Sequence, residues 1–116
     1  MTPLDDIDNV AKECSEPNWD GYGAMPVSLY SVRHAKRLVE GLPLDAKPPS
    51  ASAEPDGCIT LDWHVSHEET VSLSVLPNGS LAWAGSSHGK KFIGTANEFD
   101  RLPSALLSLV RDLGKK

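Results

Sequence analysis

The side chains best suited to chemistry in this sequence are Asp62, His64 and His67, which lie near the end of a predicted strand. Carboxylate and imidazole groups are common ligands of catalytic metals. Residues 62 and 64 point to the same face of a strand, whereas residue 67 lies beyond it and would converge with them only through a turn. The spacing also lacks the H-E-x-x-H pattern of a helical zinc site. A small metal-dependent hydrolase is therefore a remote alternative, and no metal or cofactor is predicted.

Other catalytic signatures are missing from the sequence. No serine stands in a G-x-S-x-G turn and no Walker sequence is present. Gly21 and Gly23 lack the preceding strand and the third glycine of a phosphate-binding loop. Cys14 and Cys58 are far apart and outside any C-x-x-C pattern, so both are interpreted as small buried apolar residues. We therefore predict a protein that is not an enzyme and has no catalytic residues.

The charge of the chain is distributed unevenly, although its net value is only −5. Residues 1–20 contain six acidic side chains against one lysine, and residues 48–89 contain five acidic side chains and neither lysine nor arginine. Such segments repel nucleic acid and attract basic proteins. The alternative is a solvated acidic surface that only keeps the protein in solution. The partner-binding residues predicted from this pattern are Asp5, Asp6, Asp8, Glu54, Asp56, Asp62, Glu68 and Glu69.

The elements that must position these residues follow from the apolar periodicity. Apolar side chains repeat at steps of three and four in residues 3–15 and again from Pro26 or Ser28 to Leu42. This predicts two helices within a helical part, 1–47. In residues 48–95 the period changes to two, which is the period of a half-buried strand.

Strands are predicted at residues 59–66, 70–75 and 81–84, with short additional strands near 50–53 and 91–94. The dipeptide Asn78-Gly79 indicates a tight hairpin. The last part, residues 96–116, contains a helix that begins at Asn97 or Ser104, because Pro103 divides the pattern.

This order of elements predicts one α+β domain over residues 1–116, with two N-terminal helices, a four- to five-stranded antiparallel meander and a C-terminal helix. The helices are expected to pack on one face of the sheet. No apolar run approaches the length of a membrane span, and the acidic start is unlike a secretory leader. We therefore expect a cytoplasmic monomer with no membrane partner.

The segment EPNWDGYGAMPVS, residues 16–28, joins the two predicted helices. Trp19 and Tyr22 are predicted to fill the seam between helices and sheet. Asn18 or Asp20 is predicted to cap exposed backbone groups, and the two glycines permit the turns. The alternative is that the aromatic residues contact a partner directly.

This segment also carries a resemblance. Over roughly residues 13–112 the chain resembles a group of small uncharacterised proteins of bacteria and their mobile elements that share an NWDGYGA-x-P-(I/V)-S motif. The resemblance rests on Asn18-Trp19-Asp20-Gly21-Tyr22-Gly23-Ala24, Pro26-Val27-Ser28, Pro55-Asp56-Gly57, Leu61-Asp62-Trp63 and Asn78-Gly79. It implies membership of a group and names no chemistry.

In size, acidity and layout the chain is also similar to phage-encoded anti-CRISPR proteins that inhibit type I effector complexes. Several such inhibitors present carboxylates where DNA presents phosphates. The similarity implies a DNA mimic that occupies a basic, DNA-binding surface of a protein complex and does not bind nucleic acid itself. An antitoxin or immunity protein that neutralises one cognate toxin is the alternative with the same charge pattern.

Overall fold

The computed structural model describes residues 3–42, 46–87, 89–97 and 103–112. Within them the chain forms α1 (Pro3–Glu13), α2 (Leu29–Glu40), β1 (Ser50–Ala53), β2 (Ile59–Ser66), β3 (Glu69–Val75), β4 (Leu81–Ser87), β5 (Lys90–Ala96) and α3 (Ser104–Asp112). The predicted α+β fold, with two helices, a meander and a C-terminal helix, is confirmed. The start of the last helix is also confirmed at Ser104, and its predicted approach through residues 98–102 lies outside the described residues.

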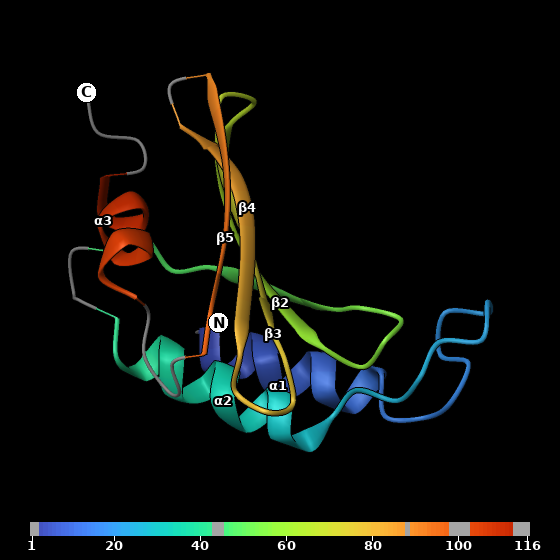
Figure 1. The fold of residues 1–116 in the computed structure, drawn as a ribbon. Coiled ribbons are helices and arrows are strands. Elements are labelled where there is room, and N and C mark those ends of the chain that lie inside the picture. The colour runs from blue at the N-terminus through green and yellow to red at the C-terminus, as the bar shows by residue number, and fades with distance from the viewer. Residues whose placement is uncertain (1–2, 43–45, 88, 98–102, 113–116) are drawn as a thin grey trace.

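The five strands form one antiparallel sheet in the order β1-β2-β3-β4-β5, so every strand pairs with its neighbour in sequence (Figure 1). Alternate side chains of each strand face opposite sides of the sheet, as the period of two predicts. Leu61 lies opposite Leu73, which lies opposite Trp83, on the face that packs against the helices. The other face carries the row Ser50, Asp62, Ser72, Ala84 and Ile93 across all five strands.

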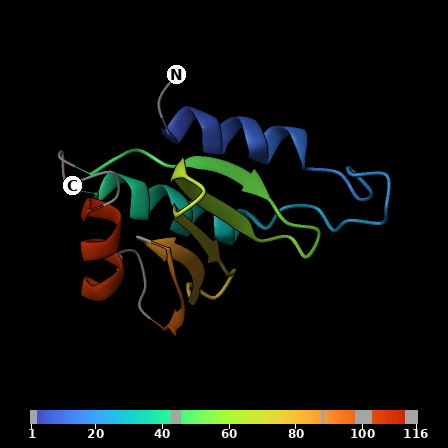
Figure 2. The same ribbon diagram turned by 90° about the horizontal axis from the view of Figure 1, so that it is seen from above.

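The helices cover the apolar face from one end. α1 contacts α2 and β1, and α2 contacts β2 and β3 (Figures 1 and 2). Ile7 of α1, Leu38 of α2 and Leu106 of α3 are fully buried or nearly so and join one core with Leu61 and Leu73. Burying large aliphatic side chains in this way is the main stabilising contribution to a domain of this size.

Polar contacts fix how the helices meet the sheet. The Ser28 hydroxyl accepts the backbone N–H of Tyr30 at 3.2 Å and so caps the start of α2. On α1, the Asp6 carboxylate accepts the N–H of Ala51 in the edge strand β1 at 2.7 Å. The indole N–H of Trp63 donates to the carbonyl of Lys47 at 2.8 Å, which holds the segment before β1 against the core.

Two glycines on the apolar face of β4 and β5 are covered by aromatic rings of the opposite strand. Gly94 pairs with Trp83, and a Cβ at Gly94 would stand 2.4 Å from the indole ring. Gly85 pairs with Phe92, and a Cβ there would stand 2.8 Å from the ring and 2.3 Å from the carbonyl oxygen of Thr70. Each ring therefore fills the space that a side chain on the neighbouring strand would need.

Candidate functional site

The most distinctive surface lies where the loop between α1 and α2 meets the turn between β1 and β2. We call this surface the loop end and define it as residues 13–28 and 54–58. Backbone hydrogen bonds join its two segments to each other and to the end of α1: Met25 N–H to Pro55 O at 2.8 Å, Ser28 N–H to Gly57 O at 2.8 Å and Val27 N–H to Cys14 O at 2.9 Å. In Figures 1 and 2 the loop extends away from the sheet beyond the ends of both helices.

The loop end is acidic. It contains no lysine, arginine or histidine, and its five carboxylates belong to Glu13, Glu16, Asp20, Glu54 and Asp56. Glu13, Glu16 and Asp56 are exposed, and the other two are half-buried. Since the two segments are held together by backbone bonds, charges that are far apart in sequence lie at one end of the molecule.

Residues 18–25 form a closed loop held by its own polar groups. Asn18 N–H donates to Ala24 O at 2.7 Å, and the Asn18 amide oxygen accepts the N–H of Gly23 at 2.6 Å. One carboxylate oxygen of Asp20 accepts the N–H groups of Tyr22 at 2.8 Å and Ala24 at 3.0 Å. The prediction that Asn18 or Asp20 caps backbone groups is confirmed, and both residues do so.

The prediction for the two aromatic residues is confirmed for one and wrong for the other. Trp19 is half-buried against the core, and its indole N–H donates to the carbonyl of Met25 at 2.7 Å. Tyr22 is 92% exposed and fills no seam. The reason is the loop closure: positive φ angles at Gly21 (78°) and Gly23 (85°) reverse the chain on both sides of Tyr22, so the ring stands at the tip.

The eight predicted partner-binding carboxylates do not form one patch. Asp6 accepts a hydrogen bond from β1, as described, and Asp8 forms an ion pair with Lys36 of α2 at 2.6 Å. Asp62 accepts the hydroxyl of Ser72 at 2.6 Å on the open face of the sheet. These three carboxylates therefore have roles within the fold.

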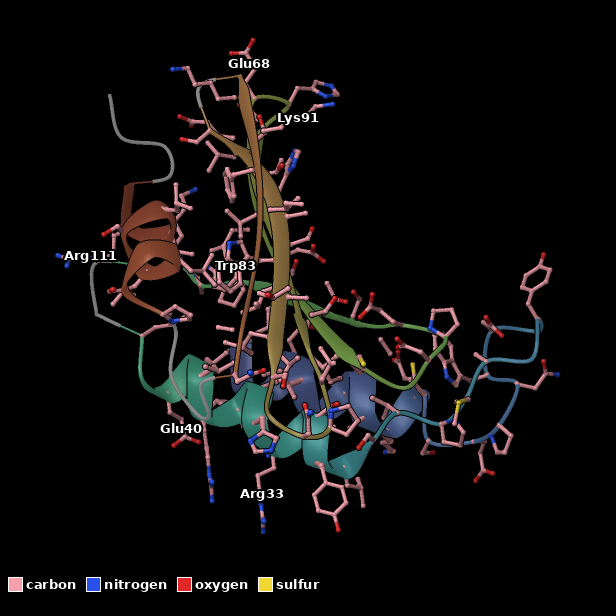
Figure 3. All side chains as sticks on the ribbon, in the orientation of Figure 1. Arg33, Glu40, Glu68, Trp83, Lys91 and Arg111 are labelled. Carbon is pink, nitrogen blue, oxygen red and sulfur yellow. The ribbon has the colours of Figure 1, made fainter. Side chains whose placement is uncertain are left out.

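The remaining members of the predicted set are divided between three places. Asp5 is exposed on α1, and Glu54 and Asp56 belong to the loop end. Glu68 and Glu69 lie at the β2–β3 hairpin, and Figure 3 places Glu68 near Lys91 at the end of the sheet away from α2. Of these, Glu54 and Asp56 are the ones that belong to the loop end, where the two segments add further acidic side chains and no cation.

The sequence interpretation missed the contribution of Glu13, Glu16 and Asp20 to this surface, and it missed the exposure of Tyr22 and Met25. A signal for the charges was present, because no cation occurs between Lys12 and Arg33. A signal for the exposed ring was the pattern Gly-Tyr-Gly, in which glycines on both sides favour a loop tip.

A metal site needs several ligand atoms close together. Among the described residues, Asp62, His64 and His67 are not brought together in this way. The group whose ligand atoms lie within 4.8 Å of one another is Glu54, Asp56 and Cys58. Burial raises the pKa of the Cys58 thiol to about 12, with further contributions from its hydrogen bond to Asp56 and from the charges of Asp56 and Glu54. A thiol that keeps its proton is a poor nucleophile.

Asp56 already has a local role in the same turn, because its carboxylate accepts the N–H of Cys58 at 3.0 Å. This is the Asx-turn geometry that stabilises a tight turn by itself. Glu54, Asp56 and Cys58 are therefore close together because they belong to one tight turn between β1 and β2. This turn supports the loop.

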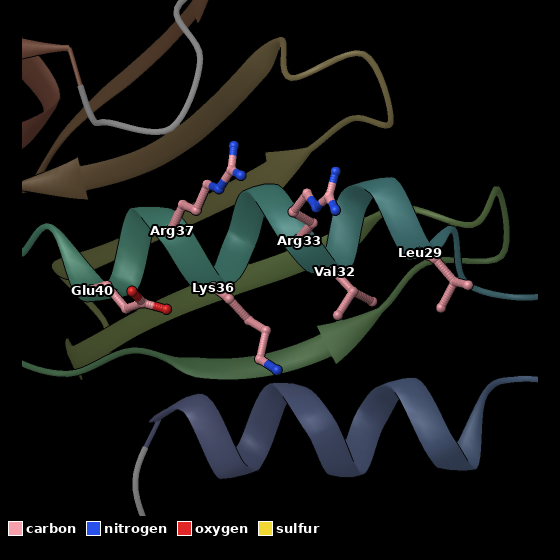
Figure 4. Close-up of a pocket in the computed structure, with 6 residues that line it drawn as sticks. All are labelled: Leu29, Val32, Arg33, Lys36, Arg37 and Glu40. Atoms are coloured by element: carbon pink, nitrogen blue, oxygen red, sulfur yellow. The ribbon is translucent and has the colours of Figure 1, made fainter.

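An open groove of about 350 Å³ runs along α2. Its lining residues are Leu29, Val32, Arg33, Lys36, Arg37 and Glu40 (Figure 4). In Figure 4 Lys36 extends toward α1, where it pairs with Asp8, whereas Arg33 and Arg37 extend away from α1. The groove is a shallow stripe on one helix with charges of both signs, so it defines no particular ligand.

Comparison with known proteins gave no match, since no family model, no curated protein and no solved structure is significantly similar to the chain. Among the described residues, no helix combines the length and apolar character needed to cross a bilayer.

Proposed function

We propose that this protein is a non-enzymatic inhibitor that binds a basic protein surface through the carboxylates of the loop end. The observation that carries the proposal is the gathering of five carboxylates on two hydrogen-bonded segments that contain no cation. In this proposal the partner is a nucleic-acid-handling complex of the type I CRISPR class, and the carboxylates stand where DNA phosphates would otherwise bind.

The division of roles among the carboxylates supports the loop end as the contact. Asp6, Asp8 and Asp62 bind groups in other elements, so recruiting them would weaken contacts that hold these elements together. At the loop end Asp20 and Asp56 accept only N–H groups of their own turns. A carboxylate has about four lone-pair sites, so each of them can still accept from a partner. Exposed groups at the loop end keep much of their hydration, and their mutual repulsion falls when a cationic surface approaches. Charges arranged in this way chiefly raise the association rate and select the partner.

The proposal predicts that binding to a purified type I surveillance complex weakens steeply with salt, because the Debye length falls to about 3 Å at 1 M ionic strength. The decisive comparison is between two variants with the same change in net charge. Glu54→Lys lies at the loop end, and Glu68→Lys lies at the β2–β3 hairpin.

We expect Glu54→Lys to weaken binding by roughly tenfold or more and Glu68→Lys to change it by less than about twofold. Equal losses in the two variants would show that only the net charge of the molecule matters. Absence of binding by the unchanged protein to any type I complex would refute the proposed partner. Rescue of cells from a co-expressed cognate toxin would then identify an antitoxin instead.

A further inference from the structure

We propose that residues 18–25 form a preorganised recognition loop, which inserts the ring of Tyr22 into an apolar pocket on the protein partner. The rim of that pocket carries lysine or arginine. This inference rests on the proposed function and deepens it, because it names the apolar anchor within the same acidic surface.

The first observation is the position of the exposed apolar side chains. Five large apolar residues are exposed within the described part of the chain, and four of them fall in residues 22–30: Tyr22 at 92%, Met25 at 60%, Leu29 at 77% and Tyr30 at 66%. Only Ile93 lies elsewhere, on β5. Leu29 and Tyr30 belong to the first turn of α2, whereas Tyr22 and Met25 belong to the loop itself. Scattered exposed apolar residues are ordinary, so the two in the loop carry the inference.

The second observation is that the loop is ordered without burying its tip. Bonds from the Asn18 and Asp20 side chains close the loop, and its last residue, Met25, donates to Pro55 of the β1–β2 turn. At Gly21 and Gly23 an added Cβ would meet no atom of the protein within 4 Å. The fold therefore maintains a constrained backbone around a ring that contributes nothing to its own core.

Such an arrangement is favourable for binding. An unstructured loop loses conformational entropy when it binds, and each flexible side chain loses more. Here the backbone is ordered on folding, and tyrosine has few rotatable bonds relative to the area that it can bury. Tyrosine is among the residues that most often contribute large shares of binding energy at the centre of an interface.

The third observation is the negative charge around the base of the loop, which indicates the class of partner that can bind there. Asp20 belongs to the loop itself, Glu16 lies two residues before it, and Glu54 and Asp56 belong to the turn that supports it. These carboxylates disfavour nucleic acid and an anionic membrane, and they complement cations at the rim of a protein pocket. The geometry points to a partner with an apolar centre and a basic rim.

The test measures the affinity of four variants for the purified type I surveillance complex at about 0.05 M and about 0.5 M salt. Tyr22→Ala removes the proposed anchor and Tyr22→Phe keeps the ring. Ile93→Ala is a matched loss of an exposed apolar side chain on the open sheet face, and Glu54→Lys changes the charge. Melting temperature is recorded for each variant.

We expect Tyr22→Ala to weaken binding roughly 30-fold, as for a hot-spot residue, with no change in melting temperature. This loss should be the same at both salt concentrations because apolar contacts are not screened, whereas the loss in Glu54→Lys should shrink at high salt. Tyr22→Phe and Ile93→Ala should bind within about twofold of the unchanged protein.

Two results would overturn the recognition loop while leaving the proposed function intact. One is unchanged affinity in Tyr22→Ala while Glu54→Lys still weakens binding. The other is an equal loss in Ile93→Ala, which would indicate a general effect of apolar surface. If the unchanged protein binds no type I complex, the proposed function is refuted and the recognition loop falls with it.

Discussion

The loop end and the β4–β5 pair are both built from glycines next to aromatic residues, and they use this combination in opposite ways. In the sheet, Gly85 and Gly94 leave room for Phe92 and Trp83, so the rings lie against the backbone of the opposite strand. In the loop, Gly21 and Gly23 have positive φ angles and open space around them, and Tyr22 projects into solvent. Glycine supplies close approach in the first region and chain reversal in the second.

The largest effect is expected where close approach involves the backbone. Gly85→Ala should lower the free energy of unfolding by about 3 kcal/mol, because its Cβ would stand 2.3 Å from the Thr70 carbonyl oxygen, which cannot move without breaking the sheet. Gly94→Ala should cost less, since its Cβ meets the Trp83 side chain, which can rotate away. Urea unfolding of both variants measures the difference, and a more costly Gly94→Ala would contradict this explanation.

The next effect separates the two aromatic residues of the loop. Trp19→Ala should lower the free energy of unfolding by about 2 kcal/mol, less than the value for a fully buried ring, because Trp19 is half-buried and bonded to Met25. Tyr22→Ala should change it by less than about 0.5 kcal/mol. Thermal melts of the pair test the assignment, and a similar destabilisation in both would mean that Tyr22 packs against the protein in solution.

A smaller effect is expected at the loop glycines. Gly21→Ala should cost about 1 kcal/mol, because a left-handed backbone is unfavourable for alanine while no steric clash is added. Gly21→Asn should cost less, since asparagine tolerates this conformation better. If alanine and asparagine are equally harmful, as measured by chemical unfolding, lack of space rather than φ is the cause.

The last effect is absent at neutral pH and concerns the turn that supports the loop. Because the pKa of Cys58 is about 12 in the folded protein and near 9.0 ordinarily, the unfolded chain loses this proton at lower pH. The Cys58 contribution to stability is therefore complete below about pH 9 and declines as the pH rises toward 12. The free energy of unfolding, measured from pH 8 upward, should fall less steeply with pH in Cys58→Ala than in the unchanged protein. The same slope in both proteins would contradict the raised pKa.

Much of the fold could be predicted because its signals are local. Alternation identified the strands, Asn78-Gly79 identified a hairpin, and Ser28 and Gly41 mark the ends of α2. The roles of individual carboxylates could not be predicted in the same way. Asp6 contacts a backbone group 45 positions away in the sequence, so nothing near it distinguishes it from an exposed acid.

The candidate site shows the same limit. Glu54 and Asp56 join the loop through backbone hydrogen bonds, which leave no signature in side-chain type. The direction of Tyr22 was also undetermined, because an aromatic residue between glycines suits either a buried corner or a loop tip. Local rules thus gave the elements, and the contacts between distant segments decided which charges and rings face solvent.

The hydrogen bond between Asp6 and Ala51 also bears on how this protein behaves at high concentration. β1 is an edge strand, and edge strands with unpaired N–H groups recruit strands from other molecules into aggregates. The Asp6 carboxylate accepts the hydrogen bond of one of these N–H groups and places a negative charge at the edge. Lys90 and Lys91 lie on β5, the strand at the opposite edge. A residue predicted to attract a partner therefore protects the sheet from unwanted strand addition.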